Sequence, residues 1–123
     1  MALEYFDWEV GDVFVLHLQG PITLGQGTQK LRELINDTVA SGRKKILLNM
    51  AEVYYIDSSG LGTLVGLYTS ARNAGGEIKL AALTARVKDV LQITKLGSIF
   101  DFHDTPEQAA ASFGGTMVMK QAG

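Results

Sequence analysis

One short apolar segment, KKILLNM at residues 44–50, constrains the fold of this chain more than any other feature. It is flanked by charge and shows no polar alternation, which is typical of a strand covered on both faces of a sheet. Helical spacing of apolar residues precedes it, from about Leu24 to Ser41, and follows it, from about Ser58 to Asn73. We therefore expect an α/β domain in which helices pack on a mixed sheet.

The rest of the chain continues the same pattern. The first 20 residues resemble a hairpin, because Gly11-Asp12 separates two alternating stretches. Later elements are a strand at 77–83, a helix around 87–94 and a helix that opens at Thr105-Pro106-Glu107, with Thr105 as its cap. A length of 123 residues suits one domain. We assign residues 1–113 to it and expect residues 114–123 to form a loose C-terminal tail.

Composition excludes several function classes. The net charge of −2 gives no general attraction to nucleic acid or anionic lipid. The chain contains no cysteine, so it has no disulfide or thiolate metal site, and this is compatible with a reducing cytosol. No apolar run approaches the length of a membrane span, and the first residues do not resemble a signal peptide. The two histidines do not suggest a metal site, and no cofactor motif is present.

Glycines are unusually frequent in the predicted helix at 58–73. On a helix, Gly62 and Gly66 lie on one side together with Ser58, beside the apolar face. Small residues at this spacing form a shallow groove that another backbone can approach closely. The occupant is either a neighbouring element of the same domain or a partner protein, and spacing alone does not decide between them.

Two serines, Ser58 and Ser59, follow Asp57 at the predicted start of this helix. A hydroxyl there ordinarily caps the free amide groups of the first turn. The same position would also hold a phosphate, because the helix dipole is positive at this end. Phosphorylation would add nearly two negative charges, against the like charge of Asp57, and would change the surface without unfolding the helix.

Enzyme motifs are absent. A nucleophile elbow needs glycine two residues before the serine, and Ile56 occupies that position relative to Ser58. Nothing in the sequence brings His17 or His103 to Ser58, so a serine hydrolase is the weakest of the functions considered. The glycines at 20–27 lack the lysine–hydroxyl pair of a phosphate-binding loop.

Residues 44–66, KKILLNMAEVYYIDSSGLGTLVG, resemble the signature of STAS domains, specifically of bacterial anti-sigma factor antagonists. The resemblance extends over about residues 4–113. It implies a mixed sheet of four to five strands with about four helices packed mainly on one face. It also implies a cytoplasmic protein that does no catalysis itself and is a monomer or a weak homodimer. The aromatic side chains of Tyr5, Phe6 and Trp8 could provide an edge for self-association.

The resemblance also implies partners. Such proteins bind an anti-sigma factor that is a serine kinase, and so release a sigma factor. The kinase binds ATP and phosphorylates the serine after the aspartate, here Ser58; the phosphate breaks the complex, and a serine phosphatase restores it. The residues expected to meet the partner are Thr23, Asp57, Ser58, Ser59, Gly62 and Gly66.

One segment departs from the family pattern. Gly20-Pro21-Ile22-Thr23 stands where the family often has Gly-Glu-Leu-Asp, so both acids are missing. Thr23 is still expected to cap the helix that follows. The departure affects partner choice and leaves an alternative, namely a STAS scaffold or subunit of a stressosome or a lipid transporter without a phosphorylation switch.

Overall fold

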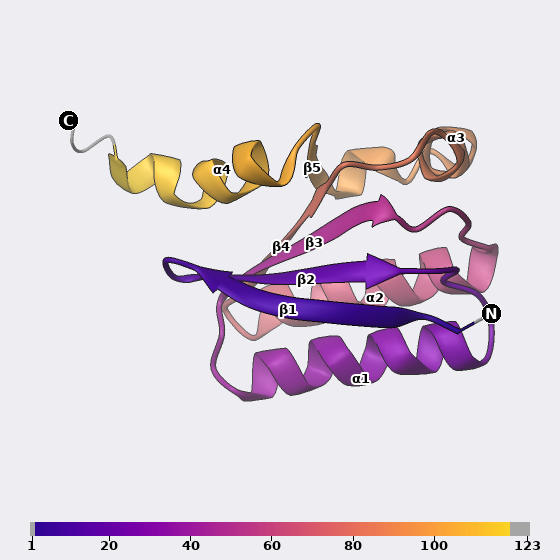
Figure 1. Cartoon of the computed structure of the whole chain (residues 1–123), viewed down its shortest axis with the longest axis horizontal. Helices are drawn as coiled ribbons and strands as arrows, with labels where there is room; N and C mark the ends of the chain where they lie inside the picture. The colour runs from indigo at the N-terminus through magenta and orange to yellow at the C-terminus, as the bar shows by residue number, and fades with distance from the viewer. Residues whose placement is uncertain (1, 119–123) are drawn as a thin grey trace.

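The computed structural model describes residues 2–118, in which five strands form one mixed sheet (Figure 1). The first two strands are antiparallel, and every later neighbour is parallel. This arrangement confirms the predicted hairpin and the mixed sheet. In spatial order the strands are β1 (Glu4–Val10), β2 (Val13–Gln19), β3 (Lys45–Glu52), β4 (Glu77–Ala81) and β5 (Asp101–His103).

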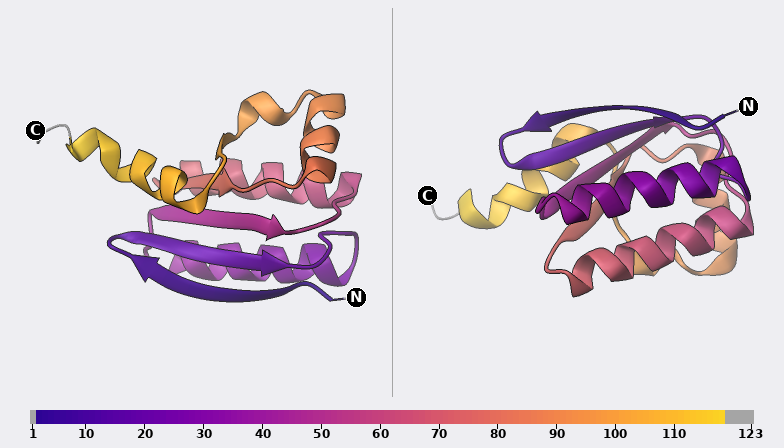
Figure 2. Two further views of the ribbon diagram at one scale, coloured as in Figure 1. Left: turned by 45° about the horizontal axis from the view of Figure 1, so that its top comes forward. Right: turned by 90° about the horizontal axis from the view of Figure 1, so that it is seen from below.

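Four α-helices cover the sheet unequally. Helices α1 (Gln26–Ala40) and α2 (Ser58–Asn73) lie side by side on one face (Figure 2). Helix α3 (Ala85–Thr94) contributes to the same core, and α4 (Pro106–Val118) packs on the opposite face. A short 3₁₀ turn, η1 (Gly97–Ile99), precedes β5. Three of the four α-helices thus share one core, which agrees with the predicted architecture.

Alternating side chains of the central strands supply both layers of the core. Leu16 and Leu48 belong to the large cluster under α1, α2 and α3, whereas Val15 and Leu47 belong to the smaller cluster under α4. Successive residues of a strand point to opposite faces, so a strand buried on both faces must be apolar throughout. This requirement explains the uninterrupted apolar run that marked β3 in the sequence.

Three local features differ from the sequence-based expectations. The cap of α1 is Gly25, with φ of 100° and no side-chain hydrogen bond, so the prediction that Thr23 caps this helix was wrong. Instead, the carbonyl of Thr23 accepts a hydrogen bond from the Thr28 amide at 3.0 Å. The strand β5 was not located, because three residues are too few to show a period. Helix α4 continues past residue 113 to Val118, and residues 119–123 of the predicted tail lie outside the described residues.

Candidate functional site

Asp57 organises the start of α2. As the N-cap residue it accepts a hydrogen bond from the Gly60 amide through Oδ1 at 2.7 Å. Its other oxygen, Oδ2, accepts from the Leu24 amide in the loop between β2 and α1, at 3.0 Å. Partial burial raises the pKa of Asp57, but these backbone donors outweigh that effect and hold the pKa below its ordinary value. The carboxylate, and not a serine hydroxyl, is therefore the cap and joins two loops.

Backbone contacts bring the same two loops together. Ile22 and Ile56 form an isolated parallel bridge, and the Ile22 amide donates to the Tyr55 carbonyl at 3.0 Å. Gly60 lies directly against this bridge, since a Cβ added to it would stand 2.0 Å from the Ile22 carbonyl oxygen. The first turn of α2 is thus held against the loop that carries Thr23 and Leu24.

Ser58 is the first residue of α2, and its side chain is exposed. Within the described residues its hydroxyl has no hydrogen-bond partner. Ser59 is half-buried and lines a groove between α1 and α2, whereas Ser58 lies next to that groove at the helix tip. The Ser58 side chain is therefore accessible from solvent without any opening of the fold.

The groove has a volume of about 610 Å³ and runs between α1 and α2. Gly62 and Gly66 form part of its α2 wall, and a Cβ added to either would meet no atom within 4 Å. No neighbouring element of the described chain fills this space. The first of the two sequence-based alternatives, packing within the domain, is thus not the reason for these two glycines. The lining residues are Leu24, Thr28, Arg32, Asn36, Ser59, Gly62, Thr63, Gly66, Leu67 and Ser70.

The structure gathers most of the predicted site residues and adds others. Asp57, Ser58 and Ser59 are consecutive at the tip of α2, and Gly62 and Gly66 follow in the adjacent groove. Thr23 is half-buried in the neighbouring loop and is not among the groove-lining residues.

Sequence reasoning missed the contribution of α1, and in the preceding loop it named Thr23 but not Leu24. Arg32 reaches across the groove and donates from Nη2 to Thr63 Oγ1 at 3.3 Å. Leu24 stands at the groove with 76% of its surface exposed. An apolar residue at the predicted start of that helix was the one available signal for Leu24.

The two histidines are engaged away from Ser58. His17 Nε2 bonds to Glu52 at 2.9 Å, and His103 Nε2 lies 3.0 Å from Asp101 and 3.2 Å from Ser112 Oγ. In a catalytic triad the serine and the acid engage different nitrogens of the histidine ring. Ser112 and Asp101 instead both engage Nε2 of His103, and the partner of His17 Nε2 is Glu52. Neither histidine therefore forms a triad with a serine in the described part of the chain.

Metal and membrane sites have no support in the residues described. No three His, Asp or Glu side chains between residues 2 and 113 converge in a way that could hold a metal ion. None of the helices within residues 2–118 is both long enough and apolar enough to cross a lipid bilayer.

Replacing Asp57 by alanine is expected to lower the free energy of unfolding by about 1–2 kcal/mol, since the N-cap is lost. Because the folded pKa of Asp57 is lowered, its stabilising contribution is present above the unfolded pKa, about 3.9, and is lost as the pH falls through the lower folded value. Urea unfolding of both proteins should show a constant difference from pH 7 to pH 5 that shrinks below about pH 4. Asp37→Ala, at an exposed position of α1, is the control and should change stability by less than about 0.5 kcal/mol. Equal stability of Asp57→Ala and the unaltered protein at pH 7 would contradict the capping role.

Comparison with known proteins agrees with this fold. The family model of the STAS domain matches residues 8–109. BtrV of Bordetella bronchiseptica, provisionally named an anti-sigma factor antagonist, is 29% identical over 85% of this chain and 90% of its own length. The crystal structure of TM1081 from Thermotoga maritima, which carries the same provisional name, superimposes with a TM-score of 0.80 at 27% identity, covering 88% of this chain and 92% of TM1081. The phosphorylated form of the Bacillus protein SpoIIAA shares the fold, with a TM-score of 0.67 at 21% identity over 89% of this chain and 99% of SpoIIAA.

Because the STAS family model matches most of the chain, this protein belongs to the STAS domain family.

Proposed function

We propose that this chain is an anti-sigma factor antagonist whose complex with an anti-sigma factor kinase is controlled by phosphorylation of Ser58. The observation that carries the proposal is the exposed Ser58 hydroxyl at the tip of α2, directly beside an open groove. The names of the relatives BtrV and TM1081 support the same class of function. The chain acts by binding, and the ATP belongs to the partner.

The groove is suited to a protein partner. Without side chains at Gly62 and Gly66, a partner backbone can come close to the axis of α2. Leu24 offers an exposed apolar contact at the groove, and the neutral Ser59 and Thr63 offer hydroxyls. Burial of the Leu24 side chain by a partner would favour binding through the hydrophobic effect.

The structure also suggests why a phosphate would act on the interface and not on the fold. The cap of α2 is Asp57, so modification of Ser58 removes no hydrogen bond that holds the helix. The Gly60 amide is already bonded to Asp57, so it is not free to neutralise a phosphate. A phosphate would bring nearly two negative charges next to an ionised carboxylate, at a surface that the partner must dehydrate.

The experiment is phosphorylation by the cognate anti-sigma factor kinase. The purified chain is incubated with this kinase and ATP, and the phosphate is mapped by mass spectrometry. We expect one phosphate on Ser58, none in Ser58→Ala, and removal by the matching serine phosphatase. A kinase complex that forms normally while Ser58 stays unmodified would disprove the switch.

A further inference from the structure

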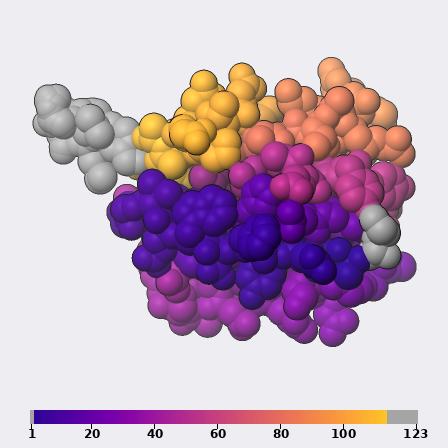
Figure 3. Space-filling model, in the orientation of Figure 1, coloured from indigo at the N-terminus to yellow at the C-terminus, as the bar shows by residue number. Residues whose placement is uncertain are grey.

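The edge strand β1 is a second exposed surface, separate from the groove. It pairs with β2 on one side only, and all seven of its residues are exposed. Figure 3 shows this indigo strand uncovered on the surface. An edge strand exposes unpaired backbone donors and acceptors that can accept a further strand.

The two faces of β1 differ in chemistry. Phe6, Trp8 and Val10 alternate on one face, with 57%, 44% and 49% of their surfaces exposed. Glu4 begins that same face, and Tyr5, Asp7 and Glu9 lie on the other face. Glu9 bonds to Arg43 at 2.6 Å, whereas the exposed Asp7 has no partner within the described residues. Over residues 6–10 the strand therefore presents an apolar row (Phe6, Trp8 and Val10) on one face and an acidic row (Asp7 and Glu9) on the other.

The apolar row is held in place by its neighbour strand. The ring of His17 lies 6.0 Å from that of Phe6 and 6.3 Å from that of Trp8, measured between centroids. His17 is fixed in turn by its 2.9 Å bond to Glu52. Ordered side chains lose less conformational entropy on binding than mobile ones.

We propose that β1 binds an extended segment of a partner protein in which basic and apolar residues alternate. An added strand continues the sheet, so its apolar residues would lie beside Phe6 and Trp8 and its basic residues beside Asp7. Backbone hydrogen bonds would provide affinity, and the alternation would provide selectivity.

A second copy of this chain is the competing occupant of this edge. Two β1 strands related by a two-fold axis pair in antiparallel fashion. The register that overlaps all seven residues places Asp7 directly opposite Asp7 of the other copy. The same register places Phe6 opposite Trp8 twice, which favours pairing, whereas the directly opposed like charges of Asp7 destabilise it. A strand with a basic residue opposite Asp7 keeps the apolar contacts without this repulsion, and we therefore favour it as the occupant.

The test uses the intact protein and a capped peptide of alternating lysine and valine, matched to the seven residues of β1. Trp8 is the only tryptophan in the chain, so its fluorescence reports binding at this strand. We expect saturable binding together with slowed hydrogen exchange of β1 amides. A glutamate–valine peptide should bind at least about tenfold more weakly. A peptide with the lysines and valines in two blocks should not slow the exchange.

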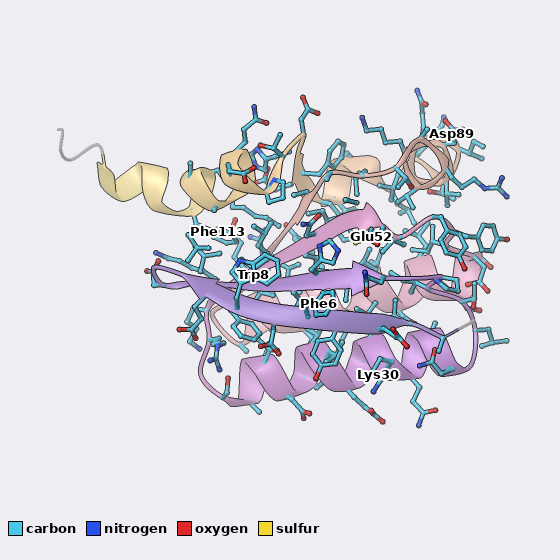
Figure 4. The ribbon with its side chains drawn as sticks, in the orientation of Figure 1. Phe6, Trp8, Lys30, Glu52, Asp89 and Phe113 are labelled. Carbon is cyan, nitrogen blue, oxygen red and sulfur yellow. The ribbon has the colours of Figure 1, made fainter. Side chains whose placement is uncertain are left out.

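Two charge reversals serve as a matched pair. Asp7→Lys should weaken binding of the lysine–valine peptide at least about tenfold and strengthen that of the glutamate–valine peptide. Asp89→Lys makes the same charge change on the distant helix α3 (Figure 4) and should leave the binding of both peptides unchanged. An absence of binding, equal weakening by both variants, or a dimer of the free chain that involves β1 would overturn the proposal. None of these measurements depends on phosphorylation of Ser58.

Discussion

Replacing Gly60 by alanine should lower the free energy of unfolding by about 3 kcal/mol or more, since a Cβ there would stand 2.0 Å from the Ile22 carbonyl oxygen and 2.9 Å from Ile56 Cγ1. Neither contact can be relieved by a simple rotation, because one atom is backbone and the other side chain is fully buried. The bridge between Ile22 and Ile56 would have to open. The melting temperature should therefore fall by about 10 °C or more.

The matched control is the same substitution two residues further along the helix. Gly62→Ala adds a methyl group in open space, so it should raise stability by about 0.5–1 kcal/mol through helix propensity. The added methyl group should at the same time weaken the kinase complex, because it stands in the groove. Equal destabilisation by both substitutions would show that the close contact at Gly60 is not the cause.

This contrast marks what the sequence could and could not predict about the site. The helix at 58–73 and its glycine-rich side followed from residue spacing, which is a local property. Glycine serves both a close internal contact and an open surface, so spacing could not separate Gly60 from Gly62 and Gly66. The distinction depends on Ile22, which lies far from Gly60 along the chain and is brought to it by the parallel bridge.

The other wall of the groove was unpredictable for the same reason. Arg32 lay off the apolar stripe of its helix and resembled an ordinary solvated side chain. Only the packing of α1 beside α2 brings it to Thr63. The capping interaction was misassigned because Asp and Ser are both good N-caps, and three such residues stand in a row at 57–59. The overall fold was predictable because its strands and helices alternate with clear periods, except for the three residues of β5.

The bonds of Asp57 connect the fold to the proposed switch. Its carboxylate ties Leu24 to the tip of α2, so the exposed leucine and the exposed serine are held at one end of the groove. A partner that contacts Leu24 and enters the groove would therefore come close to residue 58. We therefore expect partner binding to be sensitive to charge at Ser58, while the fold around it is supported by other residues.

Replacing Ser58 by aspartate should weaken the kinase complex by about 30- to 5,000-fold, because an unpaired charge buried at an interface costs about 2–5 kcal/mol. The melting temperature should stay nearly unchanged, since the Ser58 hydroxyl makes no hydrogen bond within the described residues and an acid at a helix N-terminus is favourable. Titration calorimetry of the unaltered protein and of Ser58→Asp against the kinase measures the change in affinity. Thermal unfolding of each free protein measures the change in melting temperature.

Ser58→Asn is the matched control, because asparagine has the shape of aspartate without its charge. It should retain most of the affinity, with a loss of less than about tenfold. If asparagine weakens the complex as much as aspartate, the effect is steric and the electrostatic account of the switch is wrong. If Ser58→Asp lowers the melting temperature of the free protein by as much as Gly60→Ala, Ser58 supports the fold and a phosphate there could not act on the interface alone.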